Sequence, residues 1–179
     1  MERKLDFFID DNSQERLLFR FYPRQSHCHG FGEKCPKTWK EVYKVYYSWA
    51  IIKQYKENDK VVRTRIMYKD ICDECSCLGE VSEFCHSLAK DIELITTEKD
   101  EKIYLLNNEI FPLGMGTSWK IKKKDYSWLQ NGKDIRYKFF VFSYDDIGFR
   151  FTLNKNRIKE FGDFLSQCCE YMLKHSEPI

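Results

Sequence analysis

Residues 135–173 read IRYKFFVFSYDDIGFRFTLNKNRIKEFGDFLSQCCEYML, and this stretch decides the fold. Apolar side chains occupy every second position from 135 to 141 and again from 149 to 153, which is typical of strands with one buried face. The apolar spacing then changes to three and four, which is typical of an amphipathic helix. Asn154 or Asn156 is placed to cap that helix. The apolar stripe of the expected helix consists of Ile158, Phe161, Leu165, Cys168 and Met172.

The preceding part of the chain follows the same plan. Pro23 should end the second strand, because proline cannot donate a ladder hydrogen bond. The residues Glu57, Asn58 and Asp59 predict a turn between two long strands. The sequence therefore predicts ββββα followed by ββββα, an α+β fold of antiparallel sheets with two helices; the alternative is the same set of elements without a repeat. Alternation predicts strands near 5–9, 17–21, 43–51, 62–68, 103–106 and 119–124, and helical spacing predicts a helix over 81–92.

The length of 179 residues predicts a single compact domain, 1–179. If the pattern repeat is real, its halves are 1–95 and 96–179, separated by a polar stretch. Phe and Tyr raise the aromatic content to 16%, and such residues favour strands and bury large apolar areas. The composition is therefore sufficient for a substantial core.

The net charge of +2 does not indicate a generally basic nucleic-acid binder, so such an activity would need a local basic surface. The first residues, MERKLD, lack the apolar core of a signal peptide, and no apolar run has the length of a membrane span. We therefore expect a cytoplasmic protein without a membrane partner. In that compartment the eight cysteines are expected to be free thiols or metal ligands rather than disulfides.

Two cysteine-rich loops predict a metal site. One covers residues 24–38 and the other residues 70–79, and three consecutive antiparallel strands would bring both to one end of a sheet. Thiolate and imidazole groups in a tetrahedral array are the ligands of structural zinc. One interpretation is that four of the cysteines bind a structural zinc ion. The alternative is that they are free thiols. The expected ligands are Cys28, Cys35, Cys72 and Cys75, with His27, His29 and Cys77 as substitutes.

The strands of the second half also predict a basic surface. If the apolar positions face the helix, the opposite face of the same strands collects lysine and arginine side chains, with Phe140, Phe142 and Tyr144 among them. Cations bind phosphates, and exposed rings provide a stacking surface for bases. The alternative is an ordinary solvated sheet face. The expected nucleic-acid-binding residues are Lys120, Lys122, Lys124, Arg136, Lys138 and Arg150, together with Arg63 and Arg65 from the first half.

The order of elements resembles the ββββα repeats of PUR-type and Whirly single-strand-binding proteins. The resemblance concerns element order over most of the chain and has no sequence motif behind it. It implies binding of a single strand across a curved sheet.

Two functional hypotheses follow from the sequence. The first is a non-enzymatic module that binds single-stranded nucleic acid through the basic, aromatic-interleaved sheet face. The second is a small protein-binding inhibitor of the phage or mobile-element type, which acts on a host nuclease or another defence complex. An enzyme is not expected, because the chain has no phosphate-binding glycine loop, no nucleophile elbow and no zinc-protease motif.

Overall fold

The computed structural model describes residues 4–25, 45–72, 76–90, 102–107, 117–125, 134–142 and 148–175. Its strands form two four-stranded antiparallel sheets, sheet A with the order β1-β2-β3-β4 and sheet B with the order β5-β6-β7-β8. A helix follows each sheet in the sequence, so the predicted α+β fold with the order ββββα–ββββα is confirmed. The elements are β1 (Leu5–Asp11), β2 (Glu15–Gln25), β3 (Val45–Glu57), β4 (Lys60–Cys72), α1 (Ser76–Ala89), β5 (Lys102–Asn107), β6 (Ser118–Asp125), β7 (Ile135–Phe142), β8 (Gly148–Asn154) and α2 (Lys155–His175).

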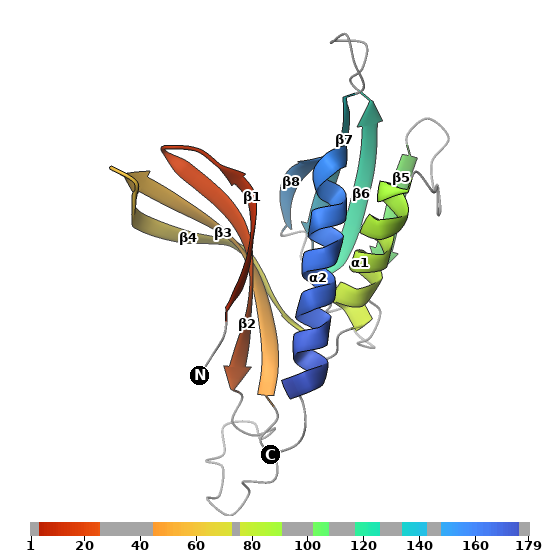
Figure 1. The fold of residues 1–179 in the computed structure, drawn as a ribbon, viewed down its shortest axis with the longest axis horizontal. Coiled ribbons are helices and arrows are strands. Elements are labelled where there is room, and N and C mark those ends of the chain that lie inside the picture. The colour runs from red at the N-terminus through yellow and green to blue at the C-terminus, as the bar shows by residue number, and fades with distance from the viewer. Residues whose placement is uncertain are drawn as a thin grey trace, which may run out of the picture.

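Sheet A is a meander of two hairpins. The β3–β4 hairpin turns at Asn58 and Asp59, whose φ angles of 51° and 63° lie in the left-handed region. Asn and Asp tolerate this region better than other residues with side chains, and two such residues in succession suit a tight hairpin turn. The turn expected from the sequence is therefore confirmed. The turns of the β1–β2 and β3–β4 hairpins both point away from the helices (Figure 1).

The expectation that Pro23 ends β2 is wrong, because the strand continues to Gln25. β1 begins at Leu5, which pairs with Phe21, so β2 has no described β1 neighbour beyond that point. Pro23 pairs with Tyr47 of β3 on the other side. A proline is tolerated where one side of a strand is an edge, since its missing N–H group then costs no ladder bond.

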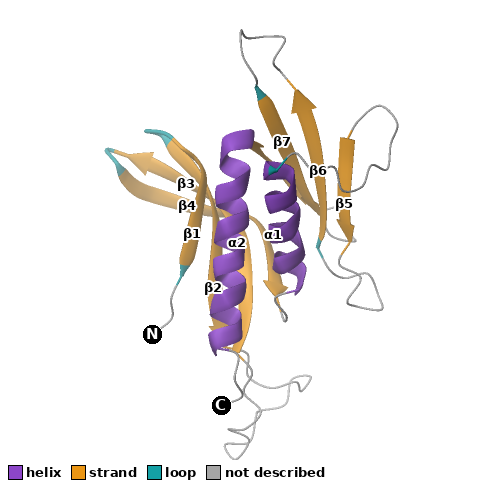
Figure 2. Cartoon of the chain, turned by 45° about the vertical axis from the view of Figure 1, so that its right-hand side comes forward, coloured by secondary structure: helices purple, strands orange, loops and turns teal. Residues whose placement is uncertain are grey.

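The two helices lie side by side, with α2 between sheet A and α1 (Figures 1 and 2). They run antiparallel, since Ser82 lies beside Ser166 while His86, one turn later on α1, lies beside Asp163. Strand β8 lies close to both edge strands of sheet A, β1 and β4. Sheet B therefore shares its apolar face with sheet A and with the helices.

Aromatic side chains from both sheets meet around Phe161 of α2. The Phe161 ring lies 5.1 Å from the Phe7 ring and 5.7 Å from the Phe19 ring, both in sheet A. It also lies 5.6 Å from the Phe139 ring and 5.9 Å from the Phe151 ring, both in sheet B. One continuous core therefore joins the two sheets through a side chain of the last helix. The predicted stripe of α2 is confirmed as buried at Ile158, Phe161, Leu165, Cys168 and Met172.

Small residues hold the two helices close together. Ser82 donates a hydrogen bond of 2.7 Å to the Gly162 carbonyl oxygen, and its hydroxyl also lies 2.7 Å from that of Ser166. A Cβ atom added at Gly162 would come within 3.0–3.1 Å of His86 and Cys85. Glycine at this position thus permits the close approach of α1.

Because the thiols of Cys85 and Cys168 are buried, we expect the folded protein to lose stability at alkaline pH. Both are fully buried, and burial raises their pKa values because the thiolate loses its hydration. The folded chain keeps these protons above about pH 8.5, where the thiols of an unfolded chain lose theirs. The free energy of unfolding should therefore fall as the pH rises, by about 0.7 kcal/mol per thiol between about pH 8 and about pH 9. Urea titrations at both pH values would measure this fall.

The variant Cys168→Ala is the control for this effect. It should show about half of the pH-dependent fall attributed to the two thiols, whatever its absolute stability. A variant with the same pH dependence as the wild type would contradict the assignment.

Candidate nucleic-acid interface

The face of sheet B that points away from the helices carries the predicted cations. Trp119, Ile121, Tyr137 and Phe139 occupy the buried face of β6 and β7, so the alternate positions lie on the outer face. Each alternate position on β6 pairs with one on β7, and that one with a position on β8. The resulting rows are Lys120–Phe140–Arg150, Lys122–Lys138–Thr152 and Lys124–Arg136–Asn154, and we call their nine residues the basic face.

The basic face concentrates positive charge. It contains six cations, and no Asp or Glu occupies an outer position of β6, β7 or β8. Lys122 lies directly opposite Lys138, and Lys124 lies directly opposite Arg136. Like charges in directly opposed positions destabilise a sheet. The middle and last rows therefore each place two cations side by side on neighbouring strands.

Two aromatic rings lie at the first-row end of the basic face. Phe140 belongs to that row, and Phe142 pairs with Ser118 and Gly148 in the next one. The rings of Phe140 and Phe142 stack with centroids 5.0 Å apart, and the Arg150 guanidinium lies 5.0 Å from the Phe140 centroid. Gly148 makes room for this arrangement, because a Cβ atom there would lie 2.6 Å from the Phe140 ring and 2.6 Å from the Val141 carbonyl oxygen. Both rings are half-buried, so their remaining surface faces solvent beside the cations.

Asp134 lies at the end of the basic face and engages Arg136. Its carboxylate accepts hydrogen bonds of 3.2 Å from Nε and 2.9 Å from Nη2 of the guanidinium. This pairing holds the arginine at the last row, next to Asn154 of β8. The basic face therefore ends in a fixed guanidinium.

The outer face of sheet A has different chemistry. Arg20 forms a two-point ion pair with Asp6, with N–O distances of 2.8 and 2.9 Å, and the hydrogen bond to Asp6 raises the pKa of the guanidinium. Lys56 pairs with Asp11 in the same sheet. Arg20 and Lys56 of sheet A are therefore paired with carboxylates of the same sheet.

Arg63 and Arg65 do not join the basic face. They lie on β4 in sheet A, paired with Tyr55 and Lys53 of β3. The Arg63 guanidinium lies 5.4 Å from the Tyr55 centroid. The structure therefore brings together six of the eight predicted residues, and it places these two arginines in the other sheet.

Most of the predicted zinc ligands fall outside the residues that the structure describes. Cys28, Cys35 and Cys75 lie outside the described residues, as do His27 and His29, and only the backbone of Cys72 is described. Within the described ranges no three His, Cys, Asp or Glu side chains gather in a way that would hold a metal ion. The expected loop over 70–79 is wrong at both ends, because β4 continues to Cys72 and α1 begins at Ser76. The hydrogen-bonded pairing of β4 with β3 carries the strand further than its turn-forming composition suggests.

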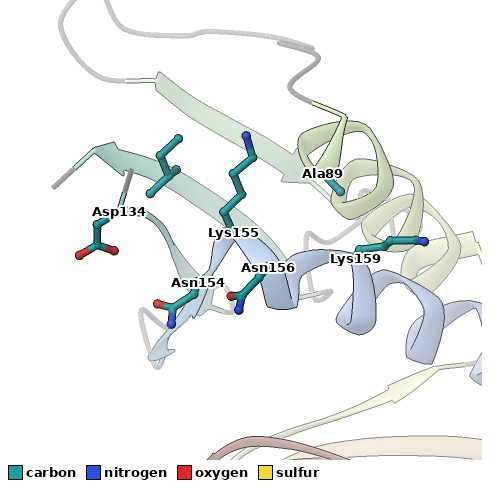
Figure 3. Close-up of a pocket in the computed structure, with 7 residues that line it drawn as sticks. Ala89, Asp134, Asn154, Lys155, Asn156 and Lys159 are labelled. Carbon is teal, nitrogen blue, oxygen red and sulfur yellow. The ribbon is translucent and has the colours of Figure 1, made fainter. Parts of the chain in front are cut away.

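Sequence reasoning did not single out Lys155 and Lys159, which line a pocket beside the last row of the basic face (Figure 3). The sequence does contain a signal for them, since two lysines stand one turn apart at the start of the expected helix. Cations are unfavourable at that end of a helix, so their presence there is unusual. Tyr144, expected among the exposed rings, lies outside the described residues.

Comparisons with protein-family models, with curated proteins and with solved structures give no match. The likeness to PUR-type and Whirly proteins therefore remains one of element order. No helix among the residues that the structure describes is long and apolar enough to cross a membrane.

Proposed function

We propose that the chain binds single-stranded nucleic acid through the basic face and carries out no reaction on it. The observation that supports this proposal is the set of six cations that strand alternation places on one sheet face. Lysine and arginine at alternate positions of a strand recur about every 6.6 Å, a spacing that lets successive cations approach successive phosphates. The rings of Phe140 and Phe142 add a sequence-tolerant surface for bases.

The dimensions of the face favour a single strand over a duplex. The axes of β6, β7 and β8 span about 10 Å before side chains are added, because neighbouring strands lie about 4.8 Å apart. The major groove of B-form DNA is about 12 Å wide, enough for a helix or a two-stranded ribbon but not for this sheet. A duplex would reach the cations only with its backbone, whereas an unpaired strand can also bring its bases to the rings.

Fluorescence anisotropy tests the proposal with a labelled oligothymidylate and a duplex of the same length. We expect micromolar or tighter binding of the single strand and weaker binding of the duplex. The logarithm of the association constant should fall linearly with that of the salt concentration, with a slope of about −4 if all six cations contact phosphates at about 0.7 each. Absence of binding to single-stranded DNA and RNA at low salt would refute the proposal.

The outer face of sheet A supports the alternative, a protein-binding inhibitor of the phage or mobile-element type. Phe8, Leu18, Ile52 and Ile66 pair in sequence across all four strands and form an apolar row. Leu18 and Ile52 are buried, while Phe8 and Ile66 remain 40% and 53% exposed at the two ends. Exposed apolar groups beside neutralised charges suit a protein interface. This alternative would gain priority if the oligonucleotide experiment gave no binding.

A further inference from the structure

Strand β4 gives sheet A its longest edge. It has 13 residues, against 6 or 7 in the other edge strands β1, β5 and β8. Within the described part of the chain it pairs on one side only, with β3. An edge strand presents a row of N–H and C=O groups that can pair with another chain. Among the described strands, β4 is therefore the longest template for strand addition.

The first half of β4 is exposed on both faces. Every residue from Lys60 to Ile66 is exposed. The apolar side chains of Val61, Val62 and Ile66 are 40%, 56% and 53% exposed. The turn that precedes this segment points away from the helices (Figure 1). A partner strand can therefore reach this edge from solvent.

The two faces of the exposed segment differ in chemistry. Strand alternation places Arg63 and Arg65 on the face that packs on the helices elsewhere in the sheet, and Thr64 and Ile66 on the outer face. Residues 63–66 keep a regular register with β3, and the register shifts lie on either side of them. Ile66 is also the last member of the apolar row on the outer face. An added strand would thus meet cations on one face and apolar surface on the other.

The charge of the segment is entirely positive. It carries three cations and no acidic residue. The Arg63 guanidinium lies 5.4 Å from the Tyr55 ring centroid, and no ion pair joins Arg63 or Arg65 to a carboxylate of the described residues. Directly opposed residues on neighbouring strands have Cβ atoms about 5 Å apart. Carboxylates on an added strand would therefore lie within pairing distance of both arginines.

A second copy of the chain is a poor partner for this edge. Antiparallel self-pairing centred on Thr64 would place Arg63 opposite Arg65, and self-pairing centred on Arg63 would place two arginines opposite each other. Like charges in these positions destabilise a sheet, and cations on an edge strand are a common device against self-pairing. They attract, however, a strand that carries acidic residues at the same positions. The edge therefore favours a partner of opposite charge.

We propose that β4 binds an extended segment of a partner protein, which adds a fifth strand to sheet A. The segment carries acidic side chains opposite Arg63 and Arg65, and an apolar side chain opposite Ile66 that lengthens the apolar row. In strand addition, main-chain hydrogen bonds supply affinity and alternate side chains supply specificity. A nucleic-acid strand would use the cations but not the edge, because it has no peptide groups to pair with β4. The site is separate from the basic face and goes beyond the proposed function.

Titration with a synthetic peptide tests the edge. The probe is Ser-Val-Glu-Thr-Glu-Val-Ser, whose palindromic order presents the same alternation in either strand direction. Added to the ¹⁵N-labelled full chain, it should shift the amide signals of residues 60–67. The same peptide with lysine in place of glutamate should bind about tenfold more weakly, because two exposed ion pairs are replaced by repulsion. The glutamate peptide with N-methylated backbone amides should cause no shifts, because it cannot donate main-chain hydrogen bonds.

A charge exchange separates binding at the edge from misfolding. The variant Arg63→Glu/Arg65→Glu should reverse the preference, so that it binds the lysine peptide more tightly than the glutamate peptide. An unfolded chain would not show a reversed preference at residues 60–67. Lys174→Glu, in the last turn of α2, is the control and should keep the preference of the wild type.

Four outcomes would overturn the inference. One is a wild-type chain whose signals at 60–67 do not respond to millimolar glutamate peptide. Another is an equal response to the lysine peptide or to the N-methylated peptide, which would mean charge attraction without strand pairing. The third is a double variant that keeps the preference of the wild type. The last is a peptide-free chain that sediments as a dimer unless Arg63 and Arg65 are replaced, which would assign the edge to a second copy. The oligothymidylate experiment decides the proposed function independently, because it depends on the basic face whether or not the peptide binds.

Discussion

The variant Phe161→Ala should be less stable than the wild type by about 3–5 kcal/mol, the usual cost of removing a buried phenyl ring and leaving a cavity. The ring has no exposed surface and contacts aromatic rings of both sheets, so neither sheet alone can close the gap. Domains of this size have a total stability of about 5–15 kcal/mol, so the loss would consume much of it. Urea unfolding followed by circular dichroism would measure the difference.

The matched control is Leu173→Ala on the same helix. Leu173 is 66% exposed, so its removal should change the stability by less than about 0.5 kcal/mol. A Phe161→Ala variant that loses no more than this control would show that Phe161 does not join the two sheets.

The double variant Lys122→Glu/Lys138→Glu should bind oligothymidylate roughly a thousandfold more weakly than the wild type. The two lysines are directly opposed in the middle row of the basic face. Near a phosphate each position would lose about 1 kcal/mol of attraction in water and gain about 1 kcal/mol of repulsion, which gives about 4 kcal/mol for the pair. The salt slope should become shallower by about 1.4, because two phosphate contacts are lost.

Arg63→Glu/Arg65→Glu makes the same change in net charge on sheet A and serves as the control. If only the basic face binds, this variant should keep the salt slope of the wild type and most of its affinity. Equal losses in the two variants would mean that overall charge, rather than the basic face, governs binding. Thermal unfolding of both variants would show whether either loss comes from misfolding.

Periodicity was sufficient to predict the element types, because each depends on neighbouring residues. The alternation at 135–141 and the spacing from Ile158 to Met172 were both confirmed, and so was the turn at Asn58 and Asp59. Pro23 was misinterpreted, because its tolerance depends on where the neighbouring strand β1 begins, which is at Leu5 opposite Phe21. A local pattern carries no information about where a neighbouring strand stops.

The sequence predicted only part of the cation set correctly, because strand alternation is a local property and membership of a sheet is not. Lys120, Lys122 and Lys124 share a face through strand alternation alone, so the sequence was enough. Arg63 and Arg65 alternate just as regularly, but the assignment of strands to two separate sheets is a long-range property. The pocket was also out of reach, because its walls come from segments more than sixty residues apart in the chain, as Ala89 and Lys159 illustrate.

The position of Phe161 has a consequence for the order in which the chain folds. The ribosome synthesises all eight strands before it reaches α2, so the strands of sheet A are present for some time without the ring that packs against their apolar side chains. Arg157 adds to this dependence, since the carbonyl oxygens of Phe8 and Ile9 must wait for a donor almost 150 residues away. Contacts of such long sequence separation slow folding and leave apolar strands exposed to other chains in the meantime. Nascent chains halted before residue 155 should therefore depend on chaperones, while completed chains should not.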